Sequence, residues 1–194
     1  MLGERWTLLI LRELIGGARR YGDLRAALPG IATNLLADRR RELEEAGLVA
    51  RTVYSLNTAG WHKVPPVVKA VATFGLDLIE PTESAITPLN GFLAGMLLAF
   101  DPPTDSGGTY HIDIDGRRFE FAVQAGELTA ATDPPAVTVS ASAADLIAAR
   151  LGASAQERKA ALRRLTFHGN RAAVTAMRRT FRLDGDPSLR MGQQ

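Results

Sequence analysis

The side chains best arranged for chemistry lie on one predicted helix, residues 31–46, which follows a Pro-Gly turn and ends before Gly47. Leucines at helical spacing give this helix one apolar side. Thr33, Asn34 and Arg41 lie on the opposite side, short and polar near the start of the helix and basic further along. Amide and hydroxyl groups pair with base edges in the DNA major groove, and arginines hold phosphates. The same pattern is also typical of a solvated surface helix, so this helix alone does not decide between the two interpretations.

Arginines cluster around this helix, although the net charge of the 194-residue chain is only +2. A local basic patch, rather than the total charge, is what attracts a nucleic-acid backbone. The arginines on this helix and in the segments beside it are Arg19, Arg20, Arg25, Arg39, Arg40, Arg41 and Arg51. We expect a DNA-binding set in which Thr33 and Asn34 meet base edges and four arginines hold phosphates, namely Arg20, Arg39, Arg41 and Arg51.

Enzyme and metal chemistry find little support in the sequence. There is no cysteine, which excludes thiolate ligands, disulfides and a cysteine nucleophile. His62, His111 and His168 lack the spacing of metal ligands, and a solvated or hydrogen-bonded histidine is the simpler interpretation of each. Phosphate-binding loops and serine-nucleophile motifs do not occur. We therefore expect no enzyme activity, no metal and no cofactor, unless titratable groups cluster in an unrecognised cleft.

The segments around this helix predict a familiar order of elements. In chain order they are an apolar helix, a short helix, the helix described above, two strands and a last helix, at residues 4–15, 21–28, 31–46, 48–51, 52–56 and 61–79. Thr58 is a possible N-cap of the last helix, and Pro65 and Pro66 would restrict its first turns. This order is that of a winged helix-turn-helix, which we assign to residues 1–80.

Three segments of the first half carry recognisable motifs: GERWTLLILREL at 3–14, ARRYGDLRAALPGIATNLLADRRRELEEAGLV at 18–49 and YSLNTAG at 54–60. Their residues and spacing resemble the HxlR-type family of bacterial transcriptional regulators, relatives of the MarR group. The resemblance implies a dimeric DNA-binding protein. It also implies that the helix at 31–46 enters the major groove of double-stranded DNA while the hairpin wing touches the backbone.

Three positions depart from that family's pattern. Asn57 replaces the threonine-like residue that usually begins the turn. Arg40 occupies a position that is usually a core leucine or isoleucine, so its side chain must extend along its methylene stem to reach solvent. Arg51 is followed directly by Thr52, without the loop residues, about two, that even a tight hairpin needs. We therefore expect part of the wing loop, and residues before Met1, to be missing from this numbering.

Residues 84–194 open with a predicted helix at 84–99 and then change to a two-residue hydrophobic period. Asp115–Gly116 predicts a hairpin turn between the first two strands. Further strands at 128–131, 137–140 and 165–168, and helices at 142–151, 155–164 and 170–182, complete this domain. Ser142 and Asn170 are the expected N-caps of the first and last of these helices. Only one sheet face is strongly apolar, which indicates an α+β domain with a five-stranded, mainly antiparallel sheet.

The Asp-Gly turn, the VTVS strand at 137–140 and LTFHGN at 165–170 resemble the sterol carrier protein 2-like (SCP2) domain. That resemblance implies an apolar cavity between helices and sheet that holds a lipid-like molecule. We expect this cavity to be lined by Leu93, Leu97, Phe119, Phe121, Ile147 and Phe167, although each residue also fits an ordinary core position.

Two functions follow from these resemblances. The first is a homodimeric, cytoplasmic, DNA-binding transcriptional regulator that an apolar small molecule tunes through the second half. The alternative is a lipid-binding carrier protein whose first half serves only dimerisation. Titrations with duplex DNA and with a fluorescent fatty acid distinguish the two. No stretch is long enough for a membrane-spanning helix, and the most apolar stretch is GFLAGMLLAF at 91–100.

Overall fold

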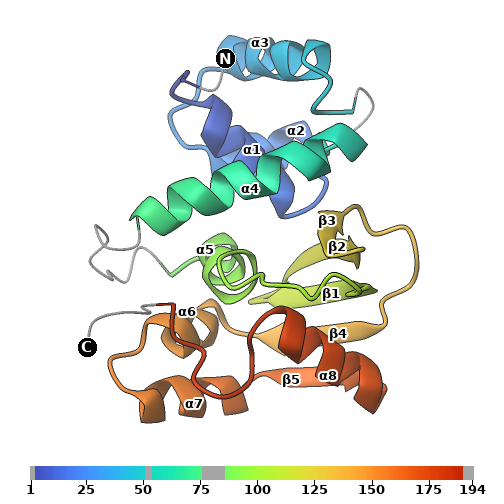
Figure 1. Cartoon of the computed structure of the whole chain (residues 1–194). Helices are drawn as coiled ribbons and strands as arrows, with labels where there is room; N and C mark the ends of the chain where they lie inside the picture. Colours follow the sequence, from blue (N-terminus) through green and yellow to red (C-terminus); the bar gives the residue numbers. More distant parts are fainter. Residues whose placement is uncertain (1–2, 51–53, 76–85, 190–194) are drawn as a thin grey trace.

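The structure is a computed structural model and describes residues 3–50, 54–75 and 86–189. A layer of helices from the first part of the chain lies above a five-stranded sheet, which has further helices packed on it (Figure 1). The expected gap in the wing and the expected phosphate contact of Arg51 lie outside the described residues. Among the described residues, no helix is both long and apolar enough to cross a membrane.

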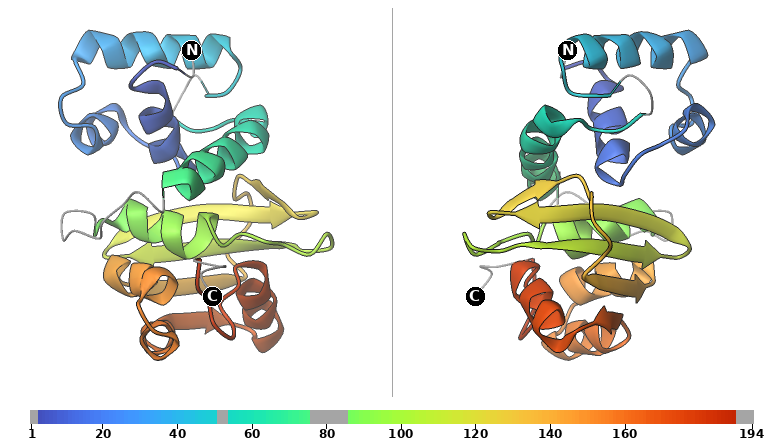
Figure 2. Two further views of the ribbon diagram at one scale, coloured as in Figure 1. Left: turned by 60° about the vertical axis from the view of Figure 1, so that its left-hand side comes forward. Right: turned by 90° about the vertical axis from the view of Figure 1, so that its right-hand side faces the viewer.

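The helical layer contains α1 (Thr7–Ile15), α2 (Tyr21–Ala27), α3 (Thr33–Glu45) and α4 (Thr58–Gly75). α1 is buried over most of its surface, which fits a central helix. α3 buries only Leu36 and Leu43 and is therefore amphipathic, as the sequence predicts. Both views of Figure 2 place α3 at the end of the molecule farthest from the sheet.

The strands predicted after α3 appear in the described residues as isolated bridges, in which Val49 pairs with Leu56 and Arg19 with Tyr54. α4 then begins at Thr58, three residues earlier than predicted. Its cap is Asn57 rather than Thr58, because Asn57 Oδ1 accepts a hydrogen bond from the Gly60 amide at 2.9 Å.

The five strands are β1 (Gly108–Ile114), β2 (Arg117–Gln124), β3 (Glu127–Thr129), β4 (Val137–Ala141) and β5 (Thr166–Gly169), in the order β3-β2-β1-β4-β5. β1 pairs antiparallel with β2 but parallel with β4. The sheet is therefore mixed, and the prediction of a mainly antiparallel sheet was wrong. Alternating side chains show that a segment is a strand, but they do not show the direction of its neighbour.

The predicted hairpin turn at Asp115–Gly116 is confirmed. Both residues have positive φ, 48° and 79°, as a two-residue turn of the primed type requires. Asp113 Oδ1 accepts a hydrogen bond from the Gly116 amide at 3.1 Å and so stabilises the turn. Asp115 Oδ2 accepts one from the Ala143 amide at 2.9 Å, which joins the turn to the helix that follows β4.

The remaining helical elements are α5 (Pro88–Phe92), the π-helix η3 (Leu93–Leu97), α6 (Ala143–Leu151), α7 (Ala155–Arg163) and α8 (Arg171–Thr180). The predicted caps of α6 and α8 are confirmed, because the Ser142 and Asn170 side chains accept backbone hydrogen bonds at 3.0 and 2.8 Å. The helix predicted at 84–99 is shorter among the described residues, because Thr87 caps it and it becomes a π-helix at Leu93.

Aromatic rings fill the space between the helices and the apolar face of the sheet. Phe92 stacks on Phe119 with 4.5 Å between ring centroids, and Phe181 meets Tyr110 and Phe121 edge-on at 5.7 Å. The opposite face presents polar side chains such as Glu120. The prediction of a single apolar face is thus confirmed.

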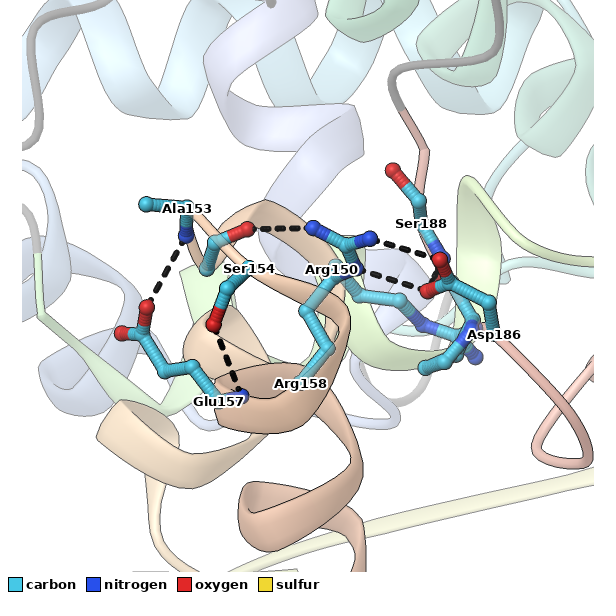
Figure 3. A network of polar contacts seen from close by, with 9 residues as sticks. Arg150, Ala153, Ser154, Glu157, Arg158, Asp186 and Ser188 are labelled. Carbon is cyan, nitrogen blue, oxygen red and sulfur yellow. Dashed lines mark hydrogen bonds and ion pairs between the residues drawn. The ribbon is translucent and has the colours of Figure 1, made fainter.

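One arginine is part of this core. Arg150, in the last turn of α6, is 1% exposed. Its guanidinium donates at 2.6–3.1 Å to four backbone carbonyls, those of Gly95, Phe181, Arg182 and Pro187. Burial, and to a lesser extent nearby Arg182, lowers the pKa of Arg150 to about 10, so it stays charged at neutral pH. Figure 3 shows it beside the bidentate pair between Arg158 and Asp186, at 2.7 and 2.6 Å.

Candidate nucleic-acid interface

The outer face of α3 carries the side chains that were predicted from the sequence to contact DNA. Thr33 and Asn34 are exposed in the first turn, and the Arg41 side chain, two turns further on, is 67% exposed. Arg41 Nη2 lies 3.3 Å from Asp38 Oδ1 on the same face. An exposed pair of this kind contributes little to stability, so a phosphate can replace the carboxylate at small cost.

The inner face of α3 holds the helix in place. Leu36 and Leu43 are almost wholly buried in the core beneath it. The Tyr21 hydroxyl donates to the Thr33 carbonyl at 3.3 Å and so fixes the leading end of α3 against α2. The exposed face therefore belongs to a helix whose position is fixed by the core beneath it, which is what a base-reading element requires.

The arginines predicted to hold phosphates divide into two groups. Arg20, at the N-cap of α2, and Arg41 are exposed. Arg39 is only 17% exposed, and its guanidinium pairs with Glu42 at 2.5 Å and with Glu4 at 3.3 Å. A phosphate contact at Arg39 therefore requires the loss of one of these ion pairs.

Arg40, the residue at a position expected to be apolar, extends out of the core. Its side chain is 32% exposed and pairs with Glu44. The guanidinium lies over the Tyr54 ring, 4.7 Å from the centroid. Arg40 thus packs α3 against Tyr54, in the second predicted strand of the wing.

A charged cluster that the sequence did not reveal connects this layer to the sheet. Glu13 of α1 is almost fully buried and lies within 3.3–3.6 Å of three guanidiniums, those of Arg12, Arg19 and Arg117. Burial, then the charge of Arg19, lowers the pKa of Arg117 to about 10, while Glu13 opposes the shift. Arg117 belongs to β2, so this carboxylate joins the helical layer to the sheet. The only sequence signal was an acidic residue inside a helix that is apolar over most of its surface.

The six residues predicted to line a lipid cavity lie in or beside the core of the second half. Leu93, Leu97, Phe119 and Phe121 are buried, whereas Ile147 and Phe167 are half-buried. Phe119 and Phe121 contact other rings, and the Phe167 ring lies 4.5 Å from the Arg178 guanidinium. Their role in ligand binding stays a prediction.

A cavity of about 280 Å³ lies where α4 meets the sheet layer, and we call it the seam pocket. Its lining residues are Trp61, His62, Pro65, Pro66, Lys69, Leu97, Phe100, Gly126, Glu127 and Leu128. Of the six residues predicted from sequence, only Leu97 belongs to it.

The histidines do not form a metal site in the described part of the chain, where no group of three potential ligands occurs. His62 Nδ1 lies 3.1 Å from Glu127 Oε2, and His111 Nε2 lies 3.5 Å from Glu120 Oε1. His111 and His168 share a sheet face but are separated by Thr138 of β4, so they do not meet on adjacent strands.

Comparison with known proteins gives a match to the HxlR-like helix-turn-helix family over residues 1–81. The uncharacterized HTH-type transcriptional regulator sll1512 of Synechocystis is 37% identical over 100 residues, covering 47% of this chain and 73% of that protein. YvaP of Bacillus subtilis, with the same description, is 31% identical over 91 residues, covering 42% and 83%. Rv3095 of Mycobacterium tuberculosis, also so described, is 53% identical over 55 residues, covering 28% and 34%. No solved structure matches the chain significantly.

Proposed function

Because this chain belongs to the HxlR-like helix-turn-helix family of DNA-binding transcriptional regulators, we propose that it reads its operator with the outer face of α3. The observation that carries the proposal is the position of this face. Thr33, Asn34 and Arg41 are exposed on a helix that lies at one end of the molecule, with its leucines buried beneath it (Figure 2).

Each exposed side chain has a role that its chemistry suits. Asn34 pairs with an adenine edge and Thr33 with a neighbouring base, because both lie in the first turn of α3. Arg20 and Arg41 hold phosphates, Arg41 after releasing its exposed partner Asp38, and Arg39 does so after exchanging one of its carboxylate partners. Arg51 is assigned to phosphate from its sequence position alone.

We propose that the regulator is a homodimer that uses the outer side of α4. Val67, Val71 and Phe74 are spaced i, i+4 and i+7, and they are 37%, 52% and 78% exposed. Such a stripe on one helix face is apolar surface that a two-fold related copy covers. Phe74→Ser should shift the mass in solution from dimer to monomer, whereas Lys63→Ser on the same helix should not. A wild-type monomer would contradict this proposal.

In the proposed organisation, residues 1–80 bind DNA and residues 84–194 form an SCP2-like sensor that takes an apolar small molecule in the cytoplasm. The mixed sheet, with helices covering its one apolar face, supports a separate sensing layer. A carrier whose first half only dimerises is the competing function. It does not require the exposed polar and basic face of α3.

The test is binding of the full chain to duplex DNA. Selection from a random duplex library should enrich one sequence, and a gel shift should confirm specific binding. Arg41→Glu should abolish that shift through charge repulsion with phosphate. Arg171→Glu, an equal change at an exposed site on α8, should leave it intact. Absence of any enriched sequence, or equal binding by Arg41→Glu, would overturn the assignment and favour the carrier.

A further inference from the structure

The seam pocket lies between the helix that completes the DNA-binding layer and the sheet layer. Trp61, Pro65 and Lys69 of α4 form one wall, since residues at this spacing share a helix face. Leu97, at the end of the π-helix η3, and Leu128 of β3 belong to the opposite wall. A molecule held here would contact both layers at once.

The pocket has the character of a small-molecule site. Its lining is mainly apolar and aromatic, with Trp61 and Phe100 as the large rings, and few polar groups. Its volume, about 280 Å³, lies just below the range of about 300–1,000 Å³ that is usual for ligand pockets, so its ligand is small. The π-helix at one wall is a second indication, since such segments occur frequently at functional sites.

Lys69 supplies the charge that selects the ligand. Its Nζ donates to the Phe100 carbonyl at 2.5 Å, and no carboxylate of the described residues lies within ion-pair distance of it. An ammonium has three donors, so this one retains capacity for a further partner. Burial lowers the pKa of Lys69. The negative charge of Asp101 partly offsets this shift, and the positive charge of Arg182 adds to it. The net lowering indicates that nearby groups do not fully compensate the ammonium for its loss of solvent.

The other charges at the pocket do not compete for this role. Glu127 and His62 pair with each other at 3.1 Å, and their side chains are 61% and 66% exposed. They therefore lie at the mouth of the pocket, where solvent screens their charge. The half-buried ammonium is the group for which an anion would gain most.

We propose that the seam pocket is the effector site of this regulator and that its ligand is a small amphipathic carboxylate. The apolar body packs against Trp61, Leu97 and Phe100, while the carboxylate accepts a hydrogen bond from Lys69 Nζ. This inference rests on the proposed function, because an effector acts by changing operator affinity. It replaces the ligand position implied by the SCP2 resemblance, because it places the ligand between the layers rather than inside the sheet core, where aromatic rings are packed against one another.

The test uses octanoate as the probe and octanol as its uncharged counterpart. The chain contains two tryptophans, so Trp6→Phe leaves Trp61 as the only indole reporter, in the pocket wall. Octanoate should change Trp61 emission saturably, and calorimetry on the wild-type chain should give the same affinity. Lys69→Met should weaken octanoate binding about tenfold or more, as expected for loss of a charge-assisted hydrogen bond. Binding of octanol should be nearly unchanged, and Lys63→Met, at an exposed site on the same helix, should behave as wild type.

Operator binding is measured on the same samples. Saturating octanoate should change wild-type operator affinity about fivefold or more, and it should have little effect on Lys69→Met. Failure of octanoate to bind, equal binding after Lys69→Met, or unchanged operator affinity would each overturn the effector site while operator binding itself persists. A wild-type chain that binds no operator would instead overturn the proposed function.

Discussion

Arginines in two regions of the molecule, the outer face of α3 and the core beside the sheet, are held in opposite ways. On α3, the Arg41 side chain is 67% exposed and its partner is an exposed carboxylate on the same helix. On α6, Arg150 is 1% exposed and donates to four backbone carbonyls. The first arginine can exchange its partner for another anion, while the second holds three segments of chain together. Sequence position in a helix does not distinguish them, but the surroundings do.

Glu13 and its arginines stand between these two cases. The carboxylate is buried, but the guanidiniums that surround it are partly exposed. A single negative charge therefore holds Arg12 and Arg19 of the helical layer together with Arg117 of the sheet. The comparison predicts that removing the charge of Arg150 destabilises the fold most, removing that of Glu13 less, and removing a charge on α3 least. The effect on DNA binding should follow the opposite order.

Arg150→Met should have the largest effect on stability. Methionine fills similar space but removes the guanidinium donor from four carbonyls, at roughly 1–3 kcal/mol for each one that stays buried without another partner. We expect the free energy of unfolding to fall by about 3–5 kcal/mol in urea denaturation. Arg171→Met, at an exposed site on α8, should change it by less than about 0.5 kcal/mol. Equally small losses of unfolding free energy in Arg150→Met and Arg171→Met would show that the buried arginine is not needed for stability.

Glu13→Gln should come second. It leaves the guanidiniums of Arg19 and Arg117 without their shared counter-charge, and we expect a loss of about 2–3 kcal/mol. A double-mutant cycle with Arg117→Met should show coupling of about 1 kcal/mol or more. The matched control is Arg118→Met, because Arg118 is the neighbouring, exposed arginine of β2 and does not contact Glu13. Additive effects of Glu13→Gln and Arg117→Met would show that the contact does not link the two layers.

Asn34→Ala should leave stability nearly unchanged and relax base preference. Loss of the amide should reduce discrimination at one base pair by about 1–3 kcal/mol. The measurement is competition between the selected operator and its single-base variants. A uniform loss across all variants would place Asn34 at the backbone rather than at a base edge.

Arg41→Met should have the smallest effect of the four substitutions, a modest loss of DNA affinity from one phosphate contact. Binding should weaken similarly for every sequence, and the slope of log K against log salt should decrease by about 1. Melting of the free protein should be unaffected, because the pair with Asp38 is exposed. A sequence-dependent loss would assign Arg41 to a base instead.

Local features of the fold were accessible from the sequence because they depend on nearby residues. The amphipathic α3, the Asp115–Gly116 turn and the caps at Ser142 and Asn170 each follow from a few adjacent side chains. The direction of β4 did not follow, since Val137, Val139 and their polar neighbours alternate identically in parallel and antiparallel pairs.

Features that join distant segments were not accessible. Glu13 and Arg117 lie 104 positions apart, and nothing local to either residue indicates that they meet. The seam pocket likewise depends on how α4 approaches β3 and η3. Of its lining residues, only Leu97 was predicted from the sequence, as one of six candidates for an apolar cavity. At the candidate DNA interface the exposed residues were predicted, but the two ion pairs of Arg39 were not.

The first turn of α4 lies in direct backbone contact with the segment that follows α3. A Cβ at Gly60 would lie 2.1 Å from the Leu48 carbonyl oxygen, so the two backbones touch with no side chain between them. Such a contact has nothing that can be compressed or can change rotamer. We therefore expect a tilt of α4 to displace residues 48–50 as well, which begin three residues after the end of α3. If a ligand binds the seam pocket as proposed, this contact is the route by which it would shift the end of α3 and change the fit of the protein to DNA.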